Sequence, residues 1–249
     1  MSNAQILTEQ LDSVYQITIN RPDKMNALTD AMYGELLAGL REASELSSIK
    51  VILICSSGAH FSAGNDLADF LQTEFNLESH VVQFLITLAK LEKPIIAAVN
   101  GAAVGIGTTM LLHCDMVFAA ADSKFSLPFI KLGLTPEGGS SRLLAQRCGV
   151  AKANDWLYSG RNILADEALS SGLVNQVFSD APAMLAKSIE YAQKIASNSL
   201  DSLVATKQVL KGDDRESTVA LIKKEAQIFA ERLQTPAAKA AFQAFLSRK

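Results

Sequence analysis

The sequence has few of the features that place a protein outside the cell, in a membrane or on nucleic acid. Its 249 residues include only three cysteines, each in or beside apolar sequence, which predicts reduced thiols and no disulfide framework. The opening residues MSNAQILTEQ lack the basic segment and apolar core of a signal peptide. No uninterrupted apolar run approaches the ~20 residues of a membrane helix. The net charge of −3 gives no basic footprint. We therefore expect a cytoplasmic protein that binds neither nucleic acid nor membrane.

Several common catalytic and cofactor-binding motifs are also missing. There is no GxxxxGK[ST] phosphate loop, and the partial GxGxxG pattern that begins at Gly105 has Met110 at its third glycine. The three histidines lack the spacing of metal ligands, and His113 is expected simply to fill an apolar helix. Serines adjoin glycines, but no GxSxG elbow is present. The sequence therefore predicts no metal and no redox cofactor.

Apolar periodicity divides the chain into two parts. Strands are predicted at 14–20, 51–55, 95–99, 116–120 and 173–178, where apolar residues alternate with polar ones or run continuously. Helical spacing predicts helices that begin near residues 30 and 108 and others at 81–91, 142–147, 165–171, 182–197, 200–210, 214–233 and from 236 onward. Because strands fill the first two-thirds and helices the last third, we expect an α/β core over residues 1–180 and a helical region over 181–249.

Two turns of small residues each follow a predicted strand and open a predicted helix. They are Ala63-Gly64 and Gly105-Ile106-Gly107. Backbone N–H groups at a helix N-terminus have no partner in the helix and lie at the positive end of its dipole. Two converging amides of this kind make an oxyanion hole. From pattern alone, it is equally plausible that the glycines only let helix and sheet pack closely.

A later turn, in the stretch from Lys93 to Arg142 that contains the second glycine turn, supplies the carboxylate of Glu137. Thr135 has the character of an N-cap and Pro136 that of a first helical residue, which would put Glu137 in the first turn of a helix. One interpretation is a general base. The plainer one is a surface carboxylate that stabilises the helix dipole by ~0.5 kcal/mol.

Four segments in this order resemble the crotonase (enoyl-CoA hydratase/isomerase) superfamily. They are 21–28 (RPDKMNAL), 61–67 (FSAGNDL), 93–101 (KPIIAAVNG) and 115–139. The resemblance covers most of the chain. It implies a spiral of β-β-α units, a C-terminal helical region used for trimer formation, and an acyl-CoA substrate whose coenzyme A is part of the substrate and no cofactor. The implied assembly is a homotrimer or a dimer of trimers.

The resemblance also implies which residues form the site. The thioester carbonyl would lie between the amides of Ala63 and Ile106, and Glu137 would be catalytic. Residues implied to contact the substrate or its coenzyme A are Lys24, Asn26, Ala27, Leu28, Ser62, Gly64, Asn65, Asp66, Leu67, Gly105, Thr109 and Phe129. Lys24 could equally be a solvated loop charge.

Two departures from the hydratase pattern bear on the reaction. Hydratases of this superfamily carry two glutamates, and this sequence has Thr109 and Phe129 at the matching positions, so we expect hydratase activity to be lost. The segment around Glu137 is instead similar to Δ3-Δ2-enoyl-CoA isomerases of the peroxisomal type, in which one glutamate moves a proton from C2 to C4. Phe129 is expected to form an apolar wall that raises the basicity of Glu137. The alternatives are a hydratase or hydrolase acting on a specialised acyl-CoA, and a non-catalytic acyl-CoA binding protein.

Overall fold

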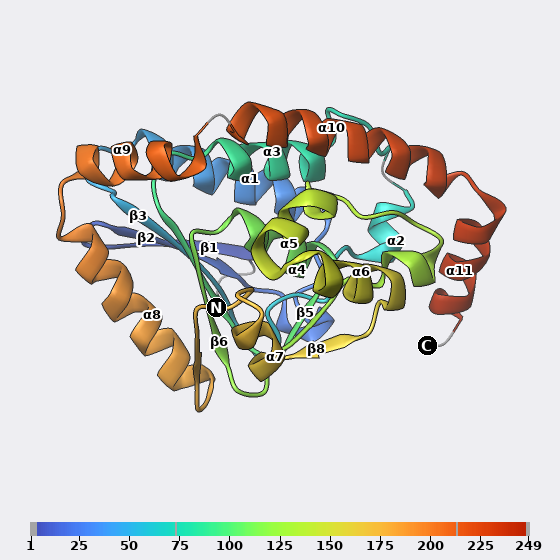
Figure 1. Cartoon of the computed structure of the whole chain (residues 1–249), viewed down its shortest axis with the longest axis horizontal. Helices are drawn as coiled ribbons and strands as arrows, with labels where there is room; N and C mark the ends of the chain where they lie inside the picture. The colour runs from blue at the N-terminus through green and yellow to red at the C-terminus, as the bar shows by residue number, and fades with distance from the viewer. Residues whose placement is uncertain (1–3, 73, 213, 248–249) are drawn as a thin grey trace.

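The structure, a computed structural model, describes residues 4–72, 74–212 and 214–247. Two β-sheets form its centre (Figure 1). The larger sheet has the strand order β1-β2-β3-β4-β6-β9, and all of its neighbouring strands are parallel except β1 and β2. Its strands are β1 (Ile6–Leu11), β2 (Val14–Ile19), β3 (Val51–Ser56), β4 (Ile95–Val99), β6 (Met116–Ala120) and β9 (Gln176–Phe178). The smaller sheet contains β5 (Ala102–Val104), β7 (Lys124–Ser126) and β8 (Asn162–Leu164).

Helices cover both faces of the larger sheet, which explains its continuous apolar strands. On β3, Val51, Leu53 and Cys55 belong to a cluster that includes residues of α8 (Ala181–Ala196). Ile52 and Ile54 point the other way, into the main core formed with α1 (Asp30–Glu45) and α3 (His80–Lys90). Side chains alternate between the two faces of a strand, so a central strand needs apolar residues at every position.

The remaining C-terminal helices pack on the same core. They are α9 (Leu200–Lys211), α10 (Asp214–Leu233) and α11 (Pro236–Leu246), and α10 lies across α3 (Figure 1). Ile222 and Phe229 of α10 and Phe242 of α11 are part of the main cluster. The division of the chain at residues 180 and 181 remains a prediction.

The shorter helical elements are η1 (Pro22–Lys24), α2 (Leu67–Phe70), α4 (Ile106–Thr109), η2 (Met110–His113), η3 (Pro128–Leu132), α5 (Ser140–Cys148), α6 (Val150–Ser159) and α7 (Ala165–Ser170).

Most elements expected from the sequence are confirmed. Strands β4 and β6 and helix α10 have the predicted bounds, and Thr29 caps α1 by accepting a hydrogen bond from the amide of Met32. The helix expected from Thr108 is wrong in extent, because it begins at Ile106 and changes to a 3₁₀ helix after Thr109. The pattern of the sequence did not predict β1, the smaller sheet or α6.

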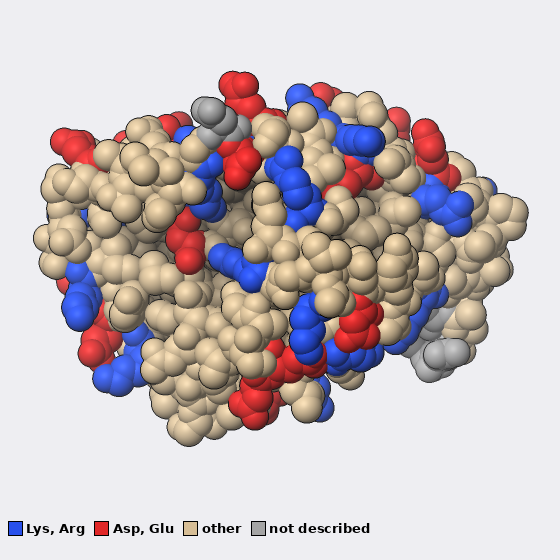
Figure 2. All heavy atoms as spheres, viewed as in Figure 1, with Lys and Arg blue, Asp and Glu red and all other residues tan. Residues whose placement is uncertain are grey.

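Two features of the structure concern the expectation that the protein binds neither membrane nor nucleic acid. No described helix is both long and apolar enough to cross a membrane. On the face drawn in Figure 2, lysine and arginine side chains are interspersed with aspartate and glutamate side chains.

Candidate active site

The first glycine turn follows β3 and is held by buried side chains. The Asn26 side chain donates to the carbonyl oxygens of Ser57 and His60, at 2.8 and 2.6 Å, and accepts from the Arg21 amide at 2.7 Å. The Ser62 hydroxyl donates to the Asn26 carbonyl at 2.9 Å and accepts from the Gly64 amide at 3.1 Å. Because these polar atoms are buried, their hydrogen bonds fix the backbone of the turn.

The second glycine turn lies directly against the first. The Val104 amide donates to the Ser62 carbonyl at 2.9 Å, and Gly105 then turns the chain with a φ of +56° into α4. A Cβ atom on Gly107 would lie 2.9 Å from the Ser62 carbonyl oxygen. The glycine there permits the close approach of α4 to the first turn, so the packing role is confirmed for Gly107, whereas a Cβ on Gly105 would meet no atom within 4 Å.

The backbone amides of the two turns correct one expectation. The Ala63 amide, expected to be a free oxyanion donor, donates to the Met25 carbonyl oxygen at 2.9 Å. Met25 and Asn26 both have positive φ values, which bend that loop back onto the turn. Within the described residues, the amides of Asn65 and Ile106 have no hydrogen-bond acceptor. The Gly107 amide, next to Ile106 at the start of α4, also has no acceptor among the described residues, so the free donors of the two turns are Asn65, Ile106 and Gly107.

Glu137 lies in a segment without regular secondary structure between η3 and α5, and the expected helix start at Thr135 and Pro136 is wrong. Gly138 and Gly139 follow with φ values of +70° and +77°, so the backbone cannot continue as a right-handed helix there. Helix α5 begins only at Ser140. The Glu137 carboxylate thus stands outside the helix.

The Glu137 side chain is buried, with only 9% of the residue exposed. The hydroxyl of Thr109, at the end of α4, donates to its Oε1 atom at 2.5 Å. Burial raises the pKa of Glu137 to about 8, against the lowering effect of the Thr109 hydrogen bond, and the charge of Glu225 raises the pKa further. A carboxyl group with a pKa near neutral pH can both take up and release a proton.

Glu137 faces a small cavity of about 10 Å³. The cavity is lined mostly by apolar side chains, and α10 supplies one wall. The lining residues are Asn65, Phe75, Val81, Val82, Leu85, Glu137, Gly138, Ile222, Ala226 and Phe229. Phe129, expected to form this wall, is not among these residues but packs edge-on behind Phe229, with the ring centroids 6.5 Å apart. The apolar surroundings of Glu137 therefore come from α3 and α10.

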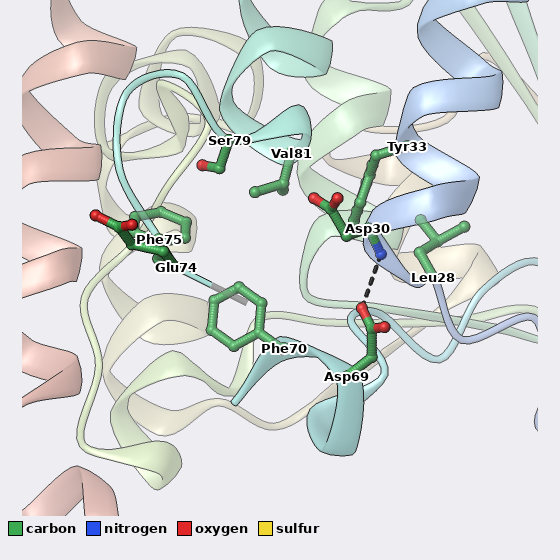
Figure 3. A pocket seen from close by; sticks show the side chains of 9 residues that line it. All are labelled: Leu28, Asp30, Tyr33, Asp69, Phe70, Glu74, Phe75, Ser79 and Val81. Atoms are coloured by element: carbon green, nitrogen blue, oxygen red, sulfur yellow. Dashed lines mark hydrogen bonds between the residues drawn. The ribbon is translucent and has the colours of Figure 1, made fainter. Parts of the chain in front are cut away.

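A second small cavity, also of about 10 Å³, lies beyond Phe75 and Val81, which line both (Figure 3). Phe70 and Phe75 pack together here, with ring centroids 5.6 Å apart. The other lining residues are Leu28, Asp30, Tyr33, Asp69, Glu74 and Ser79. The acidic residues Asp30, Asp69 and Glu74 give this cavity a more acidic border than the first. The Asp30 amide donates to the Asp69 side chain at 2.8 Å.

The residues expected to contact coenzyme A fall into two groups. Several have side chains already committed to internal contacts. Asp66 pairs with Arg21 at 2.7 Å and caps α2, and Leu28 is buried with its amide bonded to the Gly64 carbonyl. Lys24 is exposed, and Ala27 and Leu67 are partly exposed. The three lie around the first glycine turn, and their coenzyme A contacts remain predictions.

Three residues of this neighbourhood were missed or misread in the sequence. Tyr33 donates through its hydroxyl to the Asn65 side chain. His113, expected only to fill space, donates through Nε2 to the Gly138 carbonyl oxygen at 2.7 Å, and burial lowers its pKa to about 4. Glu225 of α10 contacts the turn after Glu137. They lie on separate elements, so no local spacing could link them to the site.

The two sheets and C-terminal helices are those of the crotonase fold. The crystal structure of an enoyl-CoA hydratase/isomerase from Pseudoalteromonas atlantica T6c superimposes with a TM-score of 0.94 at 39% identity, covering 99% of this chain and 98% of that one. Residues 9–249 match the family described as enoyl-CoA hydratase/isomerase. The chain therefore belongs to the enoyl-CoA hydratase/isomerase family.

Characterised relatives carry different reactions in their names. The 2,3-dehydroadipyl-CoA hydratase of Escherichia coli K12 is 32% identical over 248 residues, covering 99% of this chain and 97% of its own length. Human enoyl-CoA delta isomerase 2 is 34% identical over 247 residues, covering 96% of this chain and 62% of the human protein. Family membership defines an acyl-CoA enzyme class, and the choice of reaction rests on the residues of the site.

Proposed function

We propose that this protein is an enoyl-CoA isomerase that converts a 3-enoyl-CoA into the 2-trans-enoyl-CoA, with Glu137 as both base and acid. The observation that carries the proposal is one buried carboxylate, Glu137, whose pKa is about 8 and which faces an apolar cavity. The raised pKa makes the ionised carboxylate a stronger base than an exposed glutamate.

The reaction moves one proton and leaves the composition of the substrate unchanged. The ionised Glu137 removes a proton from C2, and the electron pair of the broken C–H bond delocalises onto the thioester oxygen to form a dienolate. The protonated Glu137 then returns the proton to C4, which shifts the double bond from C3–C4 to C2–C3. Exclusion of water by the cavity wall protects this intermediate.

We assign the oxyanion donors to the amides of Asn65 and Ile106. Their support is that both amides lack an acceptor, that the two turns are joined by the Ser62–Val104 hydrogen bond, and that Asn65 lines the same cavity as Glu137. A preorganised donor of this kind contributes ~3–4 kcal/mol to the stability of the charged intermediate.

A second candidate is hydration of a 2-enoyl-CoA, which the name of the E. coli relative suggests. Hydration needs groups that hold and activate a water molecule. Thr109 and Phe129 stand where the hydratase resemblance places glutamates, and the Thr109 hydroxyl is engaged by Glu137. A third candidate is an acyl-CoA binding protein without catalysis, which would have no use for a buried carboxylate of raised pKa.

The test follows the ultraviolet absorbance of the conjugated thioester when a 3-enoyl-CoA is added. The wild type should form it, and Glu137→Gln should lower kcat by about 10³-fold, within the 10²–10⁴ range of general acid–base catalysis. Glu216→Gln, at an exposed position of α10, is the matched control and should keep full activity. If no isomerisation occurs and an added 2-enoyl-CoA instead loses its absorbance, the protein is a hydratase. Binding of the acyl-CoA without turnover would indicate the third candidate. Full isomerase activity in Glu137→Gln would refute the proposal.

We also propose that the protein assembles as a homotrimer or a dimer of trimers. Besides the family resemblance, two neighbouring apolar residues of α9, Val209 and Leu210, are 83% and 80% exposed. A covered position in an oligomer would account for them. Sedimentation equilibrium of the wild type should give a multiple of three chains, and a monomer would contradict this assignment.

A further inference from the structure

One buried carboxylate has no part in the proton transfer described above. Glu225 lies on α10, and only 5% of the residue is exposed. Burying a carboxylate is costly unless hydrogen bonds or charges compensate. The contacts of Glu225 therefore indicate what this residue does.

Among the described residues, Glu225 accepts one hydrogen bond from the glycine turn after Glu137 and two from the first turn of α5. Its Oε2 atom accepts from the Gly139 amide at 2.6 Å. Its Oε1 atom accepts from the Ser141 amide at 3.1 Å and from the Ser141 hydroxyl at 2.5 Å. Helix α5 begins at Ser140, and its N-cap position, Gly139, has no side chain to cap it. Glu225 satisfies these amides from another helix, as a capping side chain otherwise does.

The segment held in this way is intrinsically flexible. Gly138 and Gly139 adopt successive positive φ values, and glycine loses more conformational freedom on folding than any other residue. On the other side of the turn, the His113 ring donates to the Gly138 carbonyl oxygen. The two contacts restrain the backbone within one to two residues of Glu137.

We propose that Glu225 is a positioning residue of the active site, which holds the glycine turn after Glu137 from the C-terminal helical region and thereby orients the Glu137 carboxylate toward the substrate. This inference rests on the proposed role of Glu137 as the base. It makes α10 both a wall of the cavity, through Ile222, Ala226 and Phe229, and the support of the catalytic group.

The charge of Glu225 has a second effect. It disfavours ionisation of Glu137, and this repulsion adds to burial in raising the pKa of Glu137. Other titratable groups face the pair. Tyr33 on α1 is buried near Glu137, and the ring of His113 stays neutral. Burial raises the pKa of Glu225 itself, and the hydrogen bonds from Ser141 and Gly139 and the charge of Arg142 on α5 oppose this rise. Removing the charge of Glu225 is therefore expected to change the titration of Glu137, whereas removing a neutral cap of α5 would not.

The test compares Glu225→Gln with Glu231→Gln, an exposed position further along α10. Glutamine keeps the size of the side chain but removes the charge and one acceptor. We expect kcat for a 3-enoyl-CoA to fall about 10-fold in Glu225→Gln, with KM changed less than twofold. We also expect the acidic limb of the pH profile to move to lower pH by roughly half a unit, because less repulsion opposes ionisation of Glu137. Glu231→Gln should match the wild type. An unchanged kcat and pH limb in folded Glu225→Gln, even with a lower Tm, would overturn the proposal in favour of a purely structural cap.

A second readout separates this inference from the isomerase assignment. The pKa of Glu137 is measured directly by ¹³C NMR of labelled glutamate carboxyl groups, with Glu137→Gln to assign the signal. If the wild type does not isomerise but Glu225→Gln still lowers this pKa, the isomerase assignment fails and the influence of Glu225 on Glu137 stands. If the wild type isomerises and this pKa and kcat both stay unchanged, the positioning role fails.

A milder variant guards against loss of folding. Ser141→Ala removes one of the three hydrogen bonds to Glu225 and leaves the carboxylate in place. We expect kcat to fall a few-fold with KM unchanged. If Glu225→Gln does not fold, an unchanged kcat in Ser141→Ala overturns the proposal.

Discussion

Replacing Glu137 by glutamine should stabilise the fold while it lowers kcat. The folded protein holds the Glu137 proton with a pKa of about 8, against an ordinary value of 4.5. Between these values the unfolded chain binds fewer protons than the folded one, so the free energy of unfolding falls as the pH rises. Below pH 4.5 the Glu137 carboxyl is protonated in both states and no longer lowers the free energy of unfolding.

The magnitude follows from the two pKa values. At 1.36 kcal/mol for each pKa unit, the full difference corresponds to about 5 kcal/mol above pH 8, and the part reached by pH 7 to about 3 kcal/mol. Glutamine is neutral at every pH and can still accept the Thr109 hydrogen bond. We therefore expect Glu137→Gln to be more stable than the wild type by about 3 kcal/mol at pH 7 and by little at pH 4.5.

Urea unfolding of both proteins at several pH values measures this difference. Glu216→Gln, on the surface of α10, serves as the control and should follow the wild type closely. A stability difference that does not change between pH 4.5 and pH 8 would refute a raised pKa for Glu137. It would also remove the main support for its role as the base.

Three further changes test other parts of the site. Thr109→Val removes the hydrogen bond that favours the ionised Glu137, so the acidic limb of the isomerase pH profile should move to higher pH and kcat should fall about 10-fold. Gly64→Ala should lower the free energy of unfolding by about 1–3 kcal/mol in urea titrations, because Gly64 has a φ of +89° and its new Cβ would lie 2.9 Å from the Val104 carbonyl oxygen. Phe75→Ala should join the two cavities that Phe75 lines. At ~0.8 kcal/mol for each buried methylene, kcat/KM for acyl chains two carbons longer should rise by up to about 10-fold. An unchanged chain-length preference would show that Phe75 does not separate the cavities.

The amino-acid sequence by itself determined the elements whose pattern is local. The continuous apolar runs of β3, β4 and β6 predict buried parallel strands, and the periodic spacing of α10 predicts its bounds. The two glycine turns and Glu137 were also identified as candidate site residues from short segments of the sequence. The three-residue strands of the smaller sheet escaped prediction, because so few residues carry no measurable period and pairing alone makes them strands.

Only the tertiary structure decided which atoms of the site are available. The Ala63 amide donates to the Met25 carbonyl oxygen, in a loop 38 residues earlier in the chain, whereas the Asn65 amide has no acceptor among the described residues. Glu137 stands before α5 because two positive-φ glycines delay the helix. Contacts from His113 and Glu225 restrain Glu137, although they lie 24 and 88 residues away in the sequence. Such hydrogen bonds form between segments that meet only after folding, so no local pattern of residue types predicts them.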